Sequence, residues 1–235
     1  MKKRFYKDAT IADDLDGNGY CVLLDGKKIM TPAGEPFLLP TSVLADAIAS
    51  EWNAQLDEIK PTTMPLTQIA GTAIDRVSKT REDVIDGLLK YAGTDLLCHL
   101  AENPPELVER QQAKWQPLLD WAASELGARL IPTNGIIAKT QSDDAISALR
   151  QEIEKIDTHN LTALAVLVGT CGSIVLGLAL YHKHINAQTV FDCSMLDNTW
   201  QAENWGEDWE AKERAELVMA EIKDIEKFFE LLREA

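Results

Sequence analysis

Hydrophobic residues in the first forty positions occur in short runs that are separated by turn signals. Asp16-Gly17-Asn18-Gly19 is a turn cluster, and residues 20–24 form an apolar run that ends at Asp25-Gly26. Because an Asp-Gly pair favours a tight hairpin, we predict a returning strand at residues 28–31. A third short strand is predicted at residues 36–39. Together these segments predict a small antiparallel meander.

Near residue 41 the pattern changes to the period of helices. Thr41 or Ser42 suits a helix N-cap, and the helix is predicted to end at Lys60-Pro61. Its apolar face recurs every four positions: Leu44, Ile48, Trp52 and Leu56. Further apolar faces predict helices over 66–77, 84–96, 105–126, 142–153 and 218–232. Residues 131–138 are predicted to be a strand or a loop. The fold class is therefore α+β, with a small β domain at 1–40 and a mainly α-helical domain at 41–235.

The segment 161–181 contains no charged residue and is long enough to cross a bilayer as one helix. Gly169, Ser173 and Gly177 recur every fourth position, as small residues do in membrane helix pairs. However, the segment has no strongly basic flank and lies in a chain of otherwise globular composition. We therefore predict a single central core helix, with a membrane span as the alternative.

Composition limits the classes of partner. The chain has 235 residues and a net charge of -15, so it repels phosphate backbones and anionic lipid heads. Residues 197–235 contain twelve Asp or Glu residues and five Lys or Arg residues. This excess is typical of a solvated helical face and also suits an acidic docking surface. We expect neither nucleic-acid binding nor membrane insertion.

The cysteines predict a reducing compartment. Cys21, Cys98, Cys171 and Cys193 are far apart and form no CxxC pair, so we expect free thiols. The basic start of the chain lacks the apolar run of a signal peptide. We expect a bacterial cytoplasmic protein, or a mitochondrial matrix protein if a leader has been removed.

Motifs for catalysis are not found. The sequence has no phosphate-binding glycine loop, and its four histidines and four cysteines lack zinc-site spacing, so no cofactor, metal or small-molecule substrate is expected. Adjacent acids such as Asp143-Asp144 lie in hydrophilic stretches. Acid–base catalysis needs burial to shift a pKa, so these are predicted to be surface residues. An enzyme with a carboxylate site in the helical domain remains the alternative to a binding protein.

Three of the six tryptophans cluster in the polar stretch that contains Trp200, Trp205 and Trp209. Tryptophan in such a stretch either anchors a loop to the core or contacts a partner, where it is a frequent hot spot. Both interpretations are open from the residues alone.

This stretch, with others in the same order along the chain, resembles the assembly chaperones for the α subunit of F(1)-ATPase, which include the mitochondrial complex assembly factor two. The similar segments are 3–6, 24–27, 31–32, 51–52, 65–67, 75–76, Tyr91, 94–98, 110–111, Trp115, 117–119, Leu196-Asp197, Trp200-Gln201, Glu203 and 205–208. One departure is Asn198, where the family often has an acidic residue.

The resemblance implies a small β domain and a larger helical domain, in agreement with the change of pattern near residue 41. It also implies a non-enzymatic activity: binding the unassembled α subunit and preventing its aggregation until β replaces the chaperone. The expected contact residues are Asp197, Trp200, Gln201, Glu203 and Trp205. Four further residues are expected to support this surface or to fix the helices: Asp75, Arg76, Tyr91 and Asp95.

Overall fold

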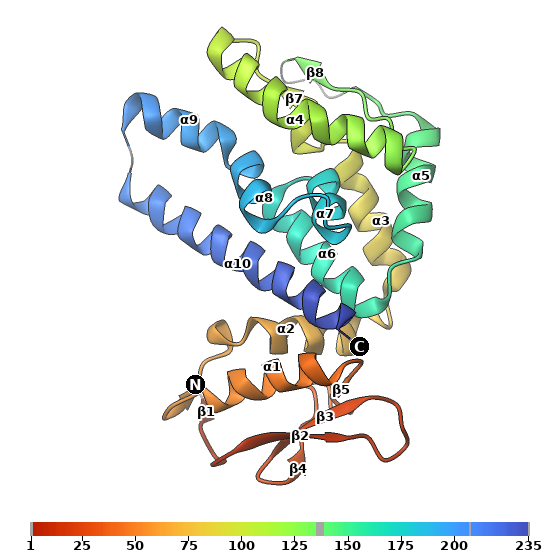
Figure 1. Ribbon diagram of the computed structural model, residues 1–235, viewed down its shortest axis with the longest axis vertical. Helices are drawn as coiled ribbons and strands as arrows, with labels where there is room; N and C mark the ends of the chain where they lie inside the picture. Colours follow the sequence, from red (N-terminus) through yellow and green to blue (C-terminus); the bar gives the residue numbers. More distant parts are fainter. Residues whose placement is uncertain (1, 135–138, 207, 235) are drawn as a thin grey trace. The chain divides into compact units, whose positions relative to one another are not determined.

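The computed structural model describes residues 2–134, 139–206 and 208–234. Within these residues the chain forms two compact units (Figure 1). The first unit contains the chain up to Arg81, residues 158–163 and the chain from Lys227 onward. The second unit contains residues 82–157 and 164–226. The domain boundary after residue 40, with a small β domain at 1–40 and an α-helical domain at 41–235, remains a prediction.

The first unit confirms the predicted antiparallel pairing but not a simple meander, because the third predicted strand pairs with the first. Strands β2 (Ala9–Asp13), β3 (Tyr20–Leu24) and β4 (Lys27–Lys28) pair in that order, and β5 (Leu38–Leu39) pairs with β3. Strand β2 was not predicted from the sequence. A separate two-stranded sheet joins β1 (Lys2–Lys3) and β6 (Glu58–Ile59).

Two strands are shorter than the sequence predicts. The returning strand is β4 at 27–28 rather than 28–31, and β5 replaces the strand expected at 36–39. Beyond Lys28, the Ile29 amide still donates to the Val22 carbonyl, but the chain then turns, with the Gly34 amide donating to the Thr31 carbonyl. Met30 and Pro36 still form an isolated antiparallel bridge, but proline has no amide hydrogen, so Pro32 and Pro36 cannot donate to a longer ladder.

Helix α1 (Ser42–Asn53) packs against β2 and β3 and forms the core of the first unit. Thr41 is its N-cap, with its hydroxyl accepting from the Leu44 amide at 3.2 Å. Leu44 and Ile48 are fully buried, as the period of four predicts. The predicted end at Lys60-Pro61 is wrong, because the side chain of Asn53 bonds the backbone of Ala9 in β2 and the helix stops there.

The first unit continues through the short helix η1 (Pro61–Thr63), helix α2 (Pro65–Thr72) and the π-helical turn η2 (Ala73–Val77). Glu51 of α1 caps α2, because its carboxylate accepts from the Leu66 and Thr67 amides at 2.8 and 2.9 Å. This contact satisfies two of the free amides at a helix N-terminus.

The second unit is mainly helical, so the α+β class is confirmed. Its elements, several of which were predicted, are α3 (Arg81–Ala92), η3 (Leu96–Cys98), α4 (Pro105–Glu125), α5 (Asp143–Glu154), α7 (Ile174–Tyr181), α8 (Ala187–Ser194) and α9 (Leu196–Trp205). Helices α6 (Thr158–Cys171) and α10 (Trp209–Arg233) contribute to both units. Strands β7 (His99–Leu100) and β8 (Thr133–Asn134) pair in parallel. Of the predicted strand or loop at 131–138, residues 135–138 lie outside the described residues.

The apolar segment 161–181 is not one helix but two. Gly172, at a φ of +71°, and Ser173 separate α6 from α7, and the Ser173 hydroxyl caps α7 by accepting from the Leu176 amide. A left-handed residue such as Gly172 ends a helix without strain. Residues 174–180 are buried, so the core location is confirmed. No helix among the described residues has the length and apolarity needed to cross a membrane.

Candidate partner-binding surface

Helix α9 carries five of the predicted site residues within ten positions. Leu196, only 2% exposed, anchors its start in the core, and the helix contacts α4 and α8. The residues brought together are Asp197, Trp200, Gln201, Glu203 and Trp205. Trp200 and Gln201 are three and four positions from Asp197 and lie on the same side of the helix as it, whereas Glu203 and Trp205 are two positions apart and point to different sides.

Glu203 is held by an arginine of α4. The Arg110 guanidinium donates to both carboxylate oxygens, at 2.5 and 3.0 Å. The hydrogen bond from Arg110 is the main reason that the pKa of Glu203 lies below its usual value. Both side chains are exposed, so solvent screens the pair and it adds little to stability. Glu203 and Arg110 therefore offer a charged pair at the surface that a partner can rearrange at little cost.

Asp197 is more tightly integrated into the fold. It accepts a hydrogen bond of 2.7 Å from the side-chain amide of Gln111, which is itself 1% exposed. The other end of that amide accepts from the Ala101 backbone at 2.7 Å. Asp197, which is half-buried, thus has one oxygen fixed to α4.

The tryptophans of this region are more exposed than core tryptophans. Trp205 is 73% exposed and Trp209 is 70% exposed, whereas Trp115 of α4 is buried and donates to the Cys193 carbonyl at 3.1 Å. Trp200 is half-buried and meets Trp205 edge to face, with ring centroids 5.3 Å apart. We call Asp197, Trp200, Gln201, Glu203, Trp205 and Trp209 the tryptophan surface. Exposed aromatic rings beside charged groups are the composition of a protein interface.

A cleft of about 350 Å³ lies beside this surface, between α8 and α9 on one side and the start of α10 on the other. Asn198 and Thr199 line it from α9, and Lys212 and Arg214 line it from α10. Asn198 carries no charge. The charged residues that line this cleft are therefore Lys212 and Arg214 of α10 and the acids Asp208 and Glu210.

Tyr91 and Asp95 pack inside the second unit, where Tyr91 is half-buried and Asp95 is buried. Asp95 is fully buried and accepts from the Leu97 amide, the Ser173 hydroxyl and the Val175 amide at 3.0 to 3.2 Å. Burial outweighs these bonds and raises the pKa of Asp95 to about 6. Tyr91 lies on α3, with its hydroxyl facing Gly169 of α6. Asp95 therefore fixes η3 to the start of α7.

Asp75 and Arg76 belong to the first unit, whereas α9 belongs to the second. Asp75 accepts from the Thr31 hydroxyl and from the Ala33 amide, at 3.1 Å for the latter, and so holds the turn after β4. Arg76 is exposed and lines a hollow beside that turn. Asp75 and Arg76 do not pair with each other, as expected for neighbours on a helix.

The candidates for catalysis are metal-binding groups, paired acids and cysteines. In the ranges that the structure describes, no three His, Cys, Asp or Glu residues are placed to hold a metal ion. Asp143 and Asp144 are exposed at the start of α5, as predicted. The four cysteines are free and buried, which confirms the prediction of unbridged thiols.

Sequence reasoning did not assign Trp209, Arg110 or Gln111 to the site. Trp209 could have been included, since it is the third tryptophan of the polar stretch. Arg110 and Gln111 lie 93 and 86 positions from their partners on α9. No local pattern signals such long-range pairs, so only the folded chain reveals them.

Comparison with known proteins assigns the family. A family model described as ATP12 chaperone protein matches residues 3–123. The crystal structure of Atp12 from Paracoccus denitrificans is 41% identical, covers 99% of each chain and has a TM-score of 0.92. The mitochondrial protein atp12 of Schizosaccharomyces pombe is 25% identical over 216 residues, which is 87% of this chain and 74% of that protein. Mitochondrial ATP12 of Saccharomyces cerevisiae is 21% identical over 248 residues, with 87% and 76% covered. The chain therefore belongs to the ATP12 chaperone protein family, the assembly chaperones of ATP synthase.

Proposed function

We propose that this chain binds the unassembled α subunit of the F(1) sector through the tryptophan surface and prevents its aggregation until β replaces the chaperone. The observation that carries the proposal is the exposure of Trp205 and Trp209, at 73% and 70%, beside the acids of α9. A subunit that awaits its partner exposes apolar area that aggregates. Rigid aromatic rings with a charged rim cover such area and can be displaced when a larger interface forms.

The supporting residues divide by role in this proposal. Asp197 and Glu203 supply the acidic contacts, and Trp200 orients Trp205 through the edge-to-face contact. Asp95 and Tyr91 fix the helices, and Asp75 fixes a turn of the first unit. We propose a location in the bacterial cytoplasm, or in the mitochondrial matrix if a leader has been removed; the yeast relatives are mitochondrial.

We also propose that the chain is a binding protein without catalytic activity. The acid with the most shifted pKa, Asp95, has its carboxylate occupied by donors of the protein itself. The net charge of -15 argues against a nucleic-acid partner.

The test is the affinity of the purified chain for the α subunit, together with the light scattering of α diluted from denaturant. We expect Trp205→Ala and Trp209→Ala each to weaken binding, by about 30-fold for a hot-spot residue worth about 2 kcal/mol. Leu15→Ala is the matched control, because Leu15 is 93% exposed and lies in the first unit. Lack of binding by the unchanged chain refutes the proposal, and unchanged affinity of both variants moves the site elsewhere.

The Arg110–Glu203 pair separates a direct contact from a structural one. If Glu203 contacts the α subunit, Glu203→Gln weakens binding while Arg110→Gln leaves it unchanged or tightens it, because the carboxylate is released. Equal weakening by both variants would show that the ion pair only shapes α9. Thermal unfolding should change little in either case, since the pair is exposed.

A further inference from the structure

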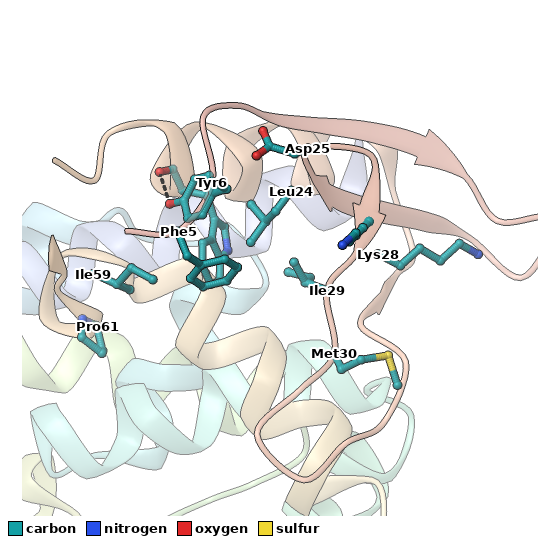
Figure 2. A pocket seen from close by; sticks show the side chains of 11 residues that line it. Phe5, Tyr6, Leu24, Asp25, Lys28, Ile29, Met30, Ile59 and Pro61 are labelled. Atoms are coloured by element: carbon teal, nitrogen blue, oxygen red, sulfur yellow. Dashed lines mark hydrogen bonds between the residues drawn. The ribbon is translucent and has the colours of Figure 1, made fainter. Parts of the chain in front are cut away.

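The first unit contains an apolar cleft that the proposed function does not use. It consists of two adjoining hollows of about 720 and 680 Å³. The hollows share five lining residues: Ile29, Met30, Trp52, Ile59 and Pro61. Figure 2 shows Ile59 and Pro61 on one side of the first hollow, Ile29 and Met30 on the other, and Phe5 and Leu24 between them.

Large apolar side chains of this cleft are open to solvent. Phe5 is 60% exposed and Met30 is 53% exposed, while Leu24, Phe37 and Met64 of the walls are buried. Contiguous exposed apolar area of this kind marks a binding site in soluble proteins. Methionine suits a surface that must adapt to a segment of variable sequence.

The indole nitrogen of Trp52 is a hydrogen-bond donor that lacks an acceptor within the residues that the structure describes. Trp52 lines both hollows, and its Nε1 is buried with no hydrogen-bond acceptor in the described structure. The hydroxyl of the neighbouring Tyr6 donates to the Trp52 carbonyl at 2.7 Å, and the two rings make an edge contact with centroids 5.6 Å apart, so Tyr6 does not supply the acceptor. A buried donor without an acceptor is costly, so an occupant that offers a carbonyl gains affinity.

Strand β4 provides an open backbone edge beside these side chains. It is the last strand in the order β2-β3-β4 and pairs with β3 on one side only, within the residues described. An edge strand can add an extended segment through backbone hydrogen bonds. Its two lysines discourage unspecific pairing; Lys28 is paired with Asp14 at 2.9 Å, so Lys27 is the cation that favours a segment with acidic side chains.

The charges around the cleft are complementary to an acidic segment. Lys27 and Arg76 line opposite hollows, and neither has an ion pair among the described residues. The two carboxylates of the lining are already engaged: Asp25 accepts from the Lys7 and Asp8 amides, and Asp75 holds the turn at Thr31. Residues 1–81 carry ten basic and eleven acidic side chains, whereas residues 82–235 carry thirteen and twenty-seven. The cleft is thus a basic-rimmed site in an acidic protein.

We infer that this cleft holds an extended apolar segment of the client protein that carries an acidic side chain next to its apolar residues. The apolar residues fill the hollows, a carbonyl of the segment accepts from Trp52 Nε1, and the acid meets Lys27 or Arg76. The inference rests on the proposed function, since it takes the α subunit as the client. It adds a second contact region, in the first unit, to the tryptophan surface of the second.

The experiment is photo-crosslinking in the complex with purified α subunit. The full chain carries p-benzoylphenylalanine in place of Met30, or in place of Leu15 as an exposed control outside the cleft. A third form, with the crosslinker in place of Trp205, reports the tryptophan surface. We expect Met30 but not Leu15 to crosslink to α, on a peptide that contains apolar residues and an Asp or Glu.

Variants supply an independent measurement. We expect Phe5→Ser with Met30→Ser, and separately Lys27→Glu with Arg76→Glu, to weaken α binding at least tenfold, and Leu15→Ser to leave it unchanged. Added salt should weaken α binding more for the unchanged chain than for the variant with Lys27→Glu and Arg76→Glu. Circular dichroism and thermal unfolding confirm that each variant is folded.

The outcomes separate this inference from the proposed function. Binding of α with a crosslink from position 205, none from position 30 and unchanged affinity of the cleft variants overturns the inference and leaves the proposed function standing. Absence of α binding by the unchanged chain overturns both. A crosslink from position 30 to a second copy of this chain, or a small apolar molecule retained there in native mass spectrometry, also overturns the inference.

Discussion

The buried carboxyl of Asp95 makes stability depend on pH in a direction that can be calculated. Its pKa is raised from 3.8 to about 6 because it is fully buried. Between these two values the folded chain binds a proton that the unfolded chain has released, so stability falls as pH rises. Above pH 6 both states are ionised and no further change comes from this group. Two pKa units correspond to about 3 kcal/mol in total, of which roughly 1–2 kcal/mol falls between pH 5 and 7.5.

The perturbation is Asp95→Asn, which keeps the shape and removes the titration. We expect the difference in unfolding free energy, unchanged chain minus variant, to fall by roughly 1–2 kcal/mol from pH 5 to pH 7.5. The assay is urea unfolding followed by tryptophan fluorescence, because five of the six tryptophans belong to the second unit with Asp95. Both measurements stay above the isoelectric point of about 4.7.

A difference that stays constant across this range would refute the reasoning, since it would mean that Asp95 is ionised throughout. That result would show that the hydrogen bonds to Asp95 offset its burial and keep its pKa low. The same variant separates the two roles foreseen for Asp95. If the residue only fixes the helices, the folded variant binds the α subunit with unchanged affinity.

Packing gives two further predictions. Gly177→Ala should destabilise the chain by about 1–3 kcal/mol in thermal or urea unfolding, because a Cβ there would lie 2.7 Å from Val168 Cγ2 and 2.9 Å from Leu164 Cδ1. Gly87→Ala is the matched control in helix α3, where a Cβ meets open space, and should instead stabilise by about 0.5–1 kcal/mol; destabilisation of equal size in both would contradict the steric argument. Trp115→Phe should lower the melting temperature through a loss of about 1–3 kcal/mol, since it removes the hydrogen bond to Cys193 and leaves a void, and an unchanged melting temperature would contradict this.

Helices with one apolar face could be predicted from the sequence. The apolar face predicted over 218–232 is part of α10, and its residues Ile222, Ile225 and Phe229 are buried. The N-cap of α1 was narrowed to Thr41 or Ser42, and the structure shows Thr41, because a cap is a local hydrogen bond within three residues. These features depend only on neighbours along the chain.

The break between α6 and α7 could not be predicted in the same way. A segment that is apolar on all sides has no periodicity, so Gly172 and Ser173 resembled other small residues of a core helix. In the fold, the Leu96 amide donates to the Gly172 carbonyl and the Ser173 hydroxyl donates to Asp95. Both partners are distant in sequence, so the position of the break is a tertiary effect.

The candidate site shows the same division. The sequence by itself determined that a tryptophan-rich acidic stretch exists between Asp197 and Trp209, because composition and local helical spacing are properties of the chain. Only the tertiary structure decided that Trp205 and Trp209 are exposed while Trp200 is half-buried, and that Arg110 and Gln111 hold the acids of α9. Exposure and ion pairing depend on which distant segments cover a residue, and that information enters only when the chain is packed.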